Sequence, residues 1–466
     1  MKEIFFNYNE RVAIIDDKGV SLSYSQMFEA ANKLFKFINK RCLVFNLCNN
    51  SIGSLIGYVS SQINHYVPLM LNEKIDETLF QNLLKTYQPE YIWCPQEKDL
   101  PFKCIYKAYG YCLYATDYAG FDLHDELALL LTTSGSTGSP KLVRQSYLNI
   151  LSNIKSIVEY LAIDANERPI TTLPMNYTYG LSIINTHLHV GATILLTDKN
   201  LLDKDFWDFF KKENATSFGG VPYTYEMLYR LKFFNMDLPS LKTMTQAGGK
   251  LLPELHKKFA EYAQSSNKNF VVMYGQTEAT ARMGYLPTDK SLEKYGSMGI
   301  AIPGGKFDLL DSQNQIITES DVVGELVYSG DNVTMGYALC GQDLIKDDER
   351  HGFLQTGDMA KRDEDGYYYI VGRLKRFLKI FGNRINLDET ERLIKSHFST
   401  IECACGGHDD LMKIYVVSND KSTIKEIRKF ISEKTHLNLT AFKIVIVKEI
   451  PKNDSGKVLY KELEKY

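Results

Sequence analysis

Short apolar runs alternate with amphipathic stretches along the first part of the chain, and this alternation constrains the fold more than any other feature. Residues 43–47 and 67–71 are largely apolar runs, and residues 51–63 between them have the spacing of a helix. A strand that is buried on both faces is apolar along its length, and helices join such strands in parallel order. The pattern therefore predicts an α/β fold with doubly wound, largely parallel sheets.

The pattern changes after about residue 290, where the apolar stretches become short and rich in β-branched and aromatic residues. Residues 306–311, 324–330 and 366–372 are such stretches, and Gly or Asp bounds them. Strands of this kind pair in antiparallel sheets. They predict a small β-barrel-like part at the end of a large N-terminal domain.

The last ~90 residues predict a separate, small α+β unit. Helices are expected at 387–398 and 422–436, and strands at 413–418 and 442–447. The sequence Gly372-Arg373-Leu374-Lys375 separates this pattern from the preceding one. We therefore expect an N-terminal domain over residues 1–374 and a C-terminal domain over residues 375–466.

Composition and charge exclude several classes of protein. The 466 residues suit two or three domains, and a formal net charge of -3 without a dense Lys/Arg run argues against a nucleic-acid partner. The first residues lack the apolar core of a secretory signal, and no run of about 18 apolar residues predicts a membrane span. The eight cysteines lack zinc-ligand and Cys-x-x-Cys spacing, which favours reduced thiols in a cytoplasmic protein.

The strongest local motif is a loop rich in glycine and hydroxyl groups between an expected strand and an expected helix. Glycines let backbone N–H groups approach phosphate oxygens, Ser and Thr hydroxyls add donors, and a lysine adds positive charge. The loop lacks the Gly-Lys-Ser/Thr of a Walker motif. It predicts a phosphate site made by Thr133, Ser134, Gly135, Ser136, Thr137, Gly138 and Lys141.

The loop Thr-Ser-Gly-Ser-Thr-Gly-Ser-Pro-Lys resembles the signature loop of the adenylate-forming (AMP-binding) superfamily, which includes acyl-CoA synthetases, amino-acid adenylation domains and luciferases. The resemblance runs from about residue 20 to Lys457, with the motifs in the family's order. It implies a mobile C-terminal domain that turns between two half-reactions, with Lys375 at the hinge.

Two further motifs of the N-terminal domain imply how ATP is held. Tyr274-Gly275-Gln276-Thr277-Glu278 resembles the family's Tyr-Gly-x-Thr-Glu. By resemblance, Tyr274 lies against adenine, Thr277 donates to the α-phosphate and Glu278 is a ligand of Mg²⁺, a cation that prefers oxygen ligands. Ala247-Gly248-Gly249 matches the turn beneath the adenine, where Gly248 and Gly249 allow close backbone approach.

Three more residues near and beyond the expected boundary complete the implied catalytic set. Asp358, in Thr356-Gly357-Asp358, would accept hydrogen bonds from the ribose hydroxyls, and Arg373 would contact the ribose or a phosphate. Lys457, in Pro451-Lys452-Asn453-Asp454-Ser455-Gly456-Lys457, would reach the carboxylate and the α-phosphate during adenylation. The family often has Arg where this chain has Tyr460, which puts one peripheral contact in doubt.

The acid and the acceptor are less well defined. Residues 173–180 align with a stretch of acyl-CoA synthetases in which Tyr177 takes the place of a usual His. No Asp lies between Leu173 and Leu181 to pair with a substrate ammonium, which disfavours amino acids with a free α-amine. The acid pocket is expected at Tyr177, Gly220, Val221, Gly248 and Gly275, and the loop 379–385 with Gly382 is expected to line the thiol tunnel.

The resemblance implies an acid–thiol ligase that forms AMP. ATP with Mg²⁺ would convert a small carboxylic acid to acyl-AMP with release of pyrophosphate, and the acyl group would then pass to a thiol. Free CoA and the phosphopantetheine of a stand-alone acyl carrier protein both remain open as acceptors. The alternatives are an amino-acid adenylating enzyme that loads a separate carrier, and a non-catalytic AMP-binding protein on the same fold. A luciferase-like oxidation shares the first half-reaction and is neither required nor forbidden.

Overall fold

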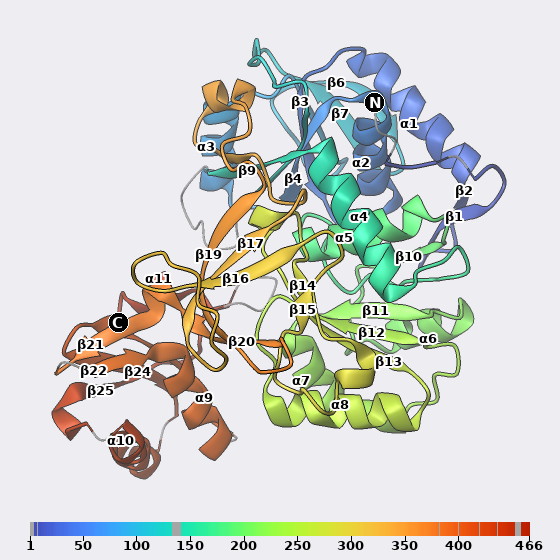
Figure 1. The fold of residues 1–466 in the computed structure, drawn as a ribbon. Coiled ribbons are helices and arrows are strands. Elements are labelled where there is room, and N and C mark those ends of the chain that lie inside the picture. The colour runs from blue at the N-terminus through green and yellow to red at the C-terminus, as the bar shows by residue number, and fades with distance from the viewer. Residues whose placement is uncertain are drawn as a thin grey trace. The chain divides into compact units, whose positions relative to one another are not determined.

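The computed structural model describes residues 4–6, 8–132, 141–381, 383–398, 400–418, 420–435, 437–452 and 458–466, without the side chains of residues 375, 383, 384 and 421. The chain is divided into two units, which are described separately, and Figure 1 labels the helices and strands along the chain. The first comprises Met1–Tyr295, Gly299–Lys306 and Tyr328–Leu354, and the second comprises Gly296–Met298, Phe307–Val327 and Gln355–Tyr466.

An eight-stranded sheet forms the larger part of the first unit. Its central strands run parallel, and antiparallel strands flank them on both sides. In spatial order the strands are β18 (Gly336–Ala338), β9 (Leu142–Ser146), β8 (Leu127–Thr132), β4 (Val67–Asn72), β3 (Leu43–Cys48), β5 (Tyr91–Pro95), β7 (Tyr111–Ala115) and β6 (Lys103–Ala108).

Helices cover both faces of this sheet because alternate residues of its strands face opposite sides. Val44 of β3 packs in one apolar cluster with α1 (Tyr24–Ile38), α2 (Ile52–Asn64), α4 (Tyr147–Leu161) and α5 (Thr178–His189). Phe45 of β3 packs in another cluster with α3 (Glu77–Tyr87). The predicted doubly wound α/β fold is therefore confirmed.

A second, five-stranded sheet of the first unit begins with three parallel strands, which positions the candidate site. Ser217, Thr243 and Asn269 are partners in register, and two short antiparallel strands extend the sheet. The strands are β11 (Ser217–Gly220), β12 (Thr243–Gln246), β13 (Asn269–Tyr274), β14 (Gly284–Tyr285) and β15 (Ile300–Ala301), with helices α6 (Lys204–Lys212), α7 (Pro222–Arg230) and α8 (Pro253–Ser265). A small third sheet contains β10 (Ile194–Leu196), β1 (Val12–Asp16) and β2 (Ser21–Ser23).

Local sequence signals account for where several helices begin. Ser23 caps α1 and Ser146 caps α4, and in each case the side chain three residues on returns a hydrogen bond to the cap. Pro222 and Pro253 occupy the first positions of α7 and α8, where a missing N–H costs nothing. These caps set the direction in which each helix leaves the preceding loop or strand.

The second unit combines a four-stranded sheet with the α+β end of the chain. The sheet orders β16 (Lys306–Leu310), β17 (Gly324–Ser329), β19 (Phe353–Arg362) and β20 (Tyr368–Arg373). The elements that follow are β21 (Phe377–Ile380), β22 (Asn383–Asn386), α9 (Leu387–His397), β23 (Glu402–His408), β24 (Leu411–Val417), α10 (Lys421–Thr435), β25 (Phe442–Ile446) and α11 (Tyr460–Leu463). The expected β-rich part and the α+β end are thus both present.

Short 3₁₀ helices complete the described elements. They are η1 (Phe233–Asn235), η2 (Thr277–Ala279), η3 (Thr288–Lys290), η4 (Gly341–Ile345), η5 (Leu374–Arg376) and η6 (Leu439–Ala441). The predicted domain boundary at Leu374 and Lys375 falls on η5, within the second unit, where it stays a prediction.

Two observations bear on the compositional expectations. Among the helices of the described residues, none combines the length and the apolar character that crossing a bilayer requires. Cys104 on β6 and Cys112 on β7 are joined by a disulfide, because their neighbouring strands bring the Cα atoms to 6.2 Å, and the other six cysteines are free. The six free cysteines agree with the expectation that most are reduced thiols, and this pair is the exception.

Candidate active site

The ends of the three parallel strands of the second sheet bring the predicted nucleotide and acid residues of the first unit together. β11 ends at Gly220, β12 at Gln246 and β13 at Tyr274, and the strands are in register. Because parallel strands end at the same edge of a sheet, the residues after them share that edge, where ligands of open α/β sheets bind. The residues so gathered are Val221, Gly248, Gly249, Gly275, Thr277 and Glu278.

Glycine is required at two of these positions. Gly248 has a φ of +82°, and a Cβ there would lie 2.5 Å from Tyr177 Oη and 3.1 Å from Val221 Cγ1. A Cβ on Gly275 would overlap the carbonyl oxygen of Ala281. Tyr177, at the start of α5, therefore lies against the turn after β12. Burial raises the pKa of Tyr177 to about 12, so its hydroxyl stays neutral.

Glu278, the predicted metal ligand, is held at both its side chain and its backbone. Tyr337 on β18 donates a hydrogen bond from its hydroxyl to Glu278 Oε1 at 2.7 Å. The backbone carbonyl of Glu278 accepts hydrogen bonds from the amide and the hydroxyl of Thr334 and from Arg350, each at 3.0 Å. Glu278 is a half-buried residue, and the hydrogen bond from Tyr337 constrains the position of its carboxylate.

Cations surround the ring of Tyr337. Lys141 Nζ lies 3.3 Å from the ring centroid, and the Arg350 guanidinium carbon lies 4.6 Å from it. Burial, followed by the charge of Glu278, raises the pKa of Tyr337, so the hydroxyl remains a donor to the carboxylate. Tyr337 therefore links Lys141, at the end of the predicted phosphate loop, to Glu278.

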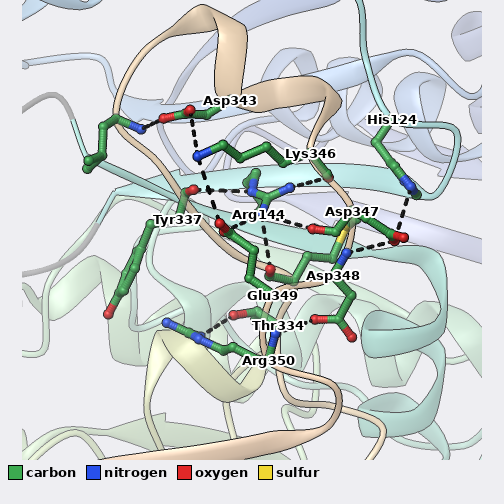
Figure 2. A network of polar contacts seen from close by, with 12 residues as sticks. His124, Arg144, Thr334, Tyr337, Asp343, Lys346, Asp347, Asp348, Glu349 and Arg350 are labelled. Carbon is green, nitrogen blue, oxygen red and sulfur yellow. Dashed lines mark hydrogen bonds and ion pairs between the residues drawn. The ribbon is translucent and has the colours of Figure 1, made fainter.

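A buried arginine fixes the segment that carries Tyr337 and Arg350, as Figure 2 shows. Arg144 on β9 has a fully buried side chain and pairs with Glu349 at 2.7 Å. It also donates to the carbonyls of Met335 at 3.1 Å, Tyr337 at 3.3 Å and Asp347 at 3.2 Å, and to that of Lys346. The strand that follows the predicted phosphate loop thus holds the segment that positions Glu278.

Sequence reasoning missed Arg144, Tyr337 and Arg350. The available signal was Arg144 itself, a charged residue within an otherwise strand-like stretch, since a fully buried arginine is rare unless it is paired. Its partners lie 191 to 205 residues further along the chain, so no local motif pointed to them.

In the second unit, the predicted ribose residues are neighbours. Asp358 on β19 and Arg373 on β20 are cross-strand partners, and Arg373 Nε lies 3.4 Å from Asp358 Oδ1. The Asp358 side chain is buried, whereas that of Arg373 is 62% exposed. The amide of Asp358 donates to Thr356 Oγ1 at 3.0 Å, and that hydroxyl donates to the Leu326 carbonyl at 2.6 Å, which fixes the turn before Asp358.

Several predicted residues lie outside the described residues. They are Thr133, Ser134, Gly135, Ser136, Thr137 and Gly138 of the phosphate loop, Gly382 of the thiol tunnel and the catalytic candidate Lys457. For Lys375 the backbone lies in η5, and its side chain is outside the description.

Tyr460, which departs from the family's usual Arg, has a structural role within the second unit. The Arg376 guanidinium carbon lies 3.7 Å from its ring centroid, and the Tyr460 hydroxyl donates to Glu391 Oε2 at 3.1 Å. Arg376 also pairs with Asp388 and Glu391, each at 2.5 Å. The tyrosine therefore closes a buried ionic cluster of this unit.

We expect Tyr460→Phe to lower the free energy of unfolding by about 1–2 kcal/mol, because Glu391 loses a hydrogen-bond donor in a buried setting. Urea unfolding measures this loss. The matched control is Tyr415→Phe, since the Tyr415 hydroxyl is buried and has no hydrogen-bond partner. An equal loss in both variants would mean that the Tyr460 hydroxyl contributes nothing specific.

Comparison with known proteins decides the family. The model of the AMP-binding enzyme family matches residues 72–338, which is more than half of the chain. The chain belongs to the AMP-binding enzyme family. Among similar proteins, the peroxisomal OPC-8:0-CoA ligase 1 of Arabidopsis thaliana is 30% identical, over 73% of this chain and 64% of that protein. The oxalate–CoA ligase of Saccharomyces cerevisiae is 26% identical, over 82% of this chain and 70% of that protein.

Solved structures agree with this AMP-binding fold. The o-succinylbenzoate CoA synthetase of Bacillus subtilis, in complex with its acyl-adenylate, superposes with a TM-score of 0.80 at 20% identity, over 98% of this chain and 95% of that chain. This likeness concerns the fold. The chain spans less than two thirds of the length of the plant CoA ligases that it matches.

Proposed function

We propose that this AMP-binding enzyme uses ATP to convert a carboxylic acid to acyl-AMP, with release of pyrophosphate, and then transfers the acyl group to a thiol. The observation that carries the proposal is the shared edge of β11, β12 and β13, where glycine turns stand beside a positioned carboxylate, Glu278. Glycine turns let a nucleotide approach the backbone, and a carboxylate can hold the cation that accompanies it. The CoA ligases among the relatives support the same reaction.

The residues at this edge fit a Mg²⁺ ion that arrives with ATP. The described residues hold no group of three or more His, Cys, Asp or Glu side chains that could bind a metal by themselves. Mg²⁺ commonly takes one or two carboxylates and completes its shell with phosphates and water. Glu278 would be the protein ligand, and the ion would neutralise charge on the phosphates.

The remaining roles follow the motifs. Tyr274, Gly248 and Gly249 would receive the adenine, and the phosphate loop with Lys141 and Thr277 would hold the phosphates. Asp358 would accept hydrogen bonds from the ribose, assisted by Arg373. Lys457 would be presented to the reacting carboxylate by a C-terminal domain that turns about Lys375, because a preorganised cation stabilises charge that develops in the transition state.

We assign the acid to a pocket between α5 and the strand ends, at Tyr177, Gly220, Val221, Gly248 and Gly275. The short distance between Gly248 and Tyr177 supports this assignment. The acceptor is CoA or the phosphopantetheine of a carrier protein, and the names of the relatives favour CoA. The lining of the thiol tunnel by Gly382 stays a prediction. A cytoplasmic location stays a prediction from the sequence, and one relative is named as a peroxisomal protein.

Pyrophosphate release over a panel of carboxylic and amino acids tests the first half-reaction. We expect release that requires both the acid and Mg²⁺-ATP, with acyl-CoA appearing when CoA is added. Release with amino acids only would favour the amino-acid adenylating alternative. Binding of AMP without turnover of any acid would favour the non-catalytic alternative.

We expect Tyr337→Phe to lower kcat/KM for Mg²⁺-ATP roughly 5- to 10-fold, because one hydrogen bond that positions Glu278 is lost. Initial rates at varied Mg²⁺-ATP measure the effect. Tyr114→Phe is the control. Tyr114 is on β7, toward the other edge of the eight-stranded sheet from β18, and its hydroxyl donates to the Lys98 carbonyl. An unchanged rate in Tyr337→Phe would contradict the positioning role.

A further inference from the structure

Arg282, between η2 and β14, is a buried cation without a carboxylate partner. Its side chain is among the largest that are fully buried, and no carboxylate of the described residues forms an ion pair with it. Nη1 donates to the Tyr160 hydroxyl at 3.3 Å and lies 3.2 Å from Met273 Sδ, and the guanidinium carbon lies 5.0 Å from the Tyr179 ring centroid. Nε has no hydrogen-bond partner.

These neighbours compensate the charge only in part. A guanidinium remains protonated inside a protein, and a buried charge without a counter-ion costs several kcal/mol. A phenol oxygen, a thioether and an aromatic face carry no formal negative charge. The positive charge of Arg282 therefore lacks a counter-ion among the described residues.

A cavity adjoins this arginine and has a second unsatisfied polar group. It is lined by Arg282, Ser217, His187, Thr243, Thr245 and Glu167, among other residues. The Ser217 hydroxyl is buried without a hydrogen-bond partner. The cavity has a volume of about 30 Å³, which is enough for the two oxygens of a carboxylate.

The other polar groups of the cavity do not supply the missing charge. His187 is neutral, because burial lowers its pKa to about 4, and Nδ1 lies 2.8 Å from the Ile183 carbonyl. Glu167 accepts a hydrogen bond from the Thr216 hydroxyl and lies 3.6 Å from Lys242 Nζ, so its carboxylate is already paired. Thr245 Oγ1 shares a hydrogen bond of 2.8 Å with the Tyr179 hydroxyl.

One face of β12 runs from the proposed acid pocket to this cavity, and the side chains of Tyr179 and Ile183 pack along it. Alternate residues of a strand face the same side, so Ala247, Thr245 and Thr243 line one face of β12 and its end. Thr243 lies four positions before Ala247, and a rise of about 3.3 Å per position corresponds to about 13 Å. On β11, a Cβ at Gly219 would lie 2.7 Å from Ile183 Cδ1 and 3.0 Å from Tyr179 Oη, so the glycine leaves room for groups of α5.

Building on the proposed function, we propose that the cavity binds a second carboxylate, at the far end of the acid that the enzyme activates. The first carboxylate lies at the strand ends near Gly248, and the chain of the acid runs along this face of β12. The side chains of Tyr177 and Tyr179, which pack here in the free protein, turn aside to admit the chain. Arg282 supplies the positive charge for the far carboxylate, and Ser217 supplies a hydroxyl donor.

The test compares dicarboxylic acids, from succinic to dodecanedioic acid, with their monomethyl esters, which lack the far charge. We expect the wild-type enzyme to turn over one length of diacid roughly 10- to 100-fold better than its monoester, as charge-assisted hydrogen bonds predict. Arg282→Met should abolish that ratio, Ser217→Ala should reduce it several-fold and Arg282→Lys should keep part of it. A wild-type preference for the monoester, or an unchanged ratio in Arg282→Met, would overturn the proposal.

Melting temperatures separate this inference from the proposed function. Without ligand, Arg282→Met should melt no lower than the wild type, because an apolar side chain replaces an uncompensated charge; a large drop would assign Arg282 a purely structural role. If the enzyme releases pyrophosphate with none of the acids, the proposed function is wrong. The subsite is then tested by the effect of a diacid on the melting temperature. A diacid that raises the melting temperature of the wild type but not of Arg282→Met supports it, and the absence of such a rise overturns it. If acetate raised the melting temperature of the wild type as much as a diacid does, the cavity would bind a separate small anion. That result would overturn the proposal that it binds the far carboxylate of the substrate.

Discussion

Lys457→Ala is expected to slow acyl-adenylate formation about 30- to 1000-fold, while acyl transfer from pre-formed acyl-AMP to the thiol survives. One preorganised charged donor contributes roughly 2–4 kcal/mol to a transition state, which corresponds to that range of rates. The motif that ends in Lys457 resembles that of adenylate-forming enzymes, whose C-terminal domain presents this lysine in only one of two orientations. A group that leaves the site between the steps can serve only the first of them.

The two half-reactions are assayed separately, by pyrophosphate exchange and by CoA thioester formation from synthetic acyl-AMP. Lys461→Ala is the matched control, because Lys461 is an exposed lysine of the same terminal segment, on α11, and neither rate should change. Equal losses in both steps, with the fold intact, would show that Lys457 is not confined to adenylation. Normal adenylation would remove it from the catalytic residues.

The alternation of strands and helices was predictable because a strand that is buried on both faces has apolar residues along its length, which the local sequence shows. The apolar residues 43–47 correspond to β3, and the stretch 242–247 contains β12, Thr243–Gln246. The position of the site at the strand ends follows from the same pattern, since the residues after parallel strands share an edge. Gly248 and Gly275 were singled out by their motifs, and the structure adds that a Cβ at either position would meet a neighbour.

Contacts between distant parts of the chain were not predictable. β18, Gly336–Ala338, lies beyond the point where the sequence suggested a separate β-rich part, yet it pairs with β9 of the eight-stranded sheet. That pairing places Tyr337 against Glu278, which lies 59 residues earlier. A strand of three residues has too little pattern to indicate its partner, so the support of Glu278 could be found only in three dimensions.

The support of Glu278 makes its charge testable by itself. In Glu278→Gln the amide oxygen can still accept the hydrogen bond from Tyr337, and the backbone carbonyl keeps its donors Thr334 and Arg350. Only the negative charge is lost. We expect kcat/KM for Mg²⁺-ATP to fall roughly 100- to 1000-fold, because loss of one preorganised electrostatic contact costs about 3–4 kcal/mol.

Initial rates over a matrix of Mg²⁺ and ATP concentrations measure this loss, and the Mg²⁺ concentration at half-maximal rate should rise. Glu213→Gln is the control, since that carboxylate, at the end of α6, pairs with Arg168 at 3.0 Å and makes no contact with the segment that positions Glu278. It should lower the unfolding free energy and leave the Mg²⁺ dependence as in the wild type. If Glu278→Gln kept both the rate and the Mg²⁺ dependence, the Glu278 carboxylate would not be a metal ligand. Another residue would then have to bind the Mg²⁺.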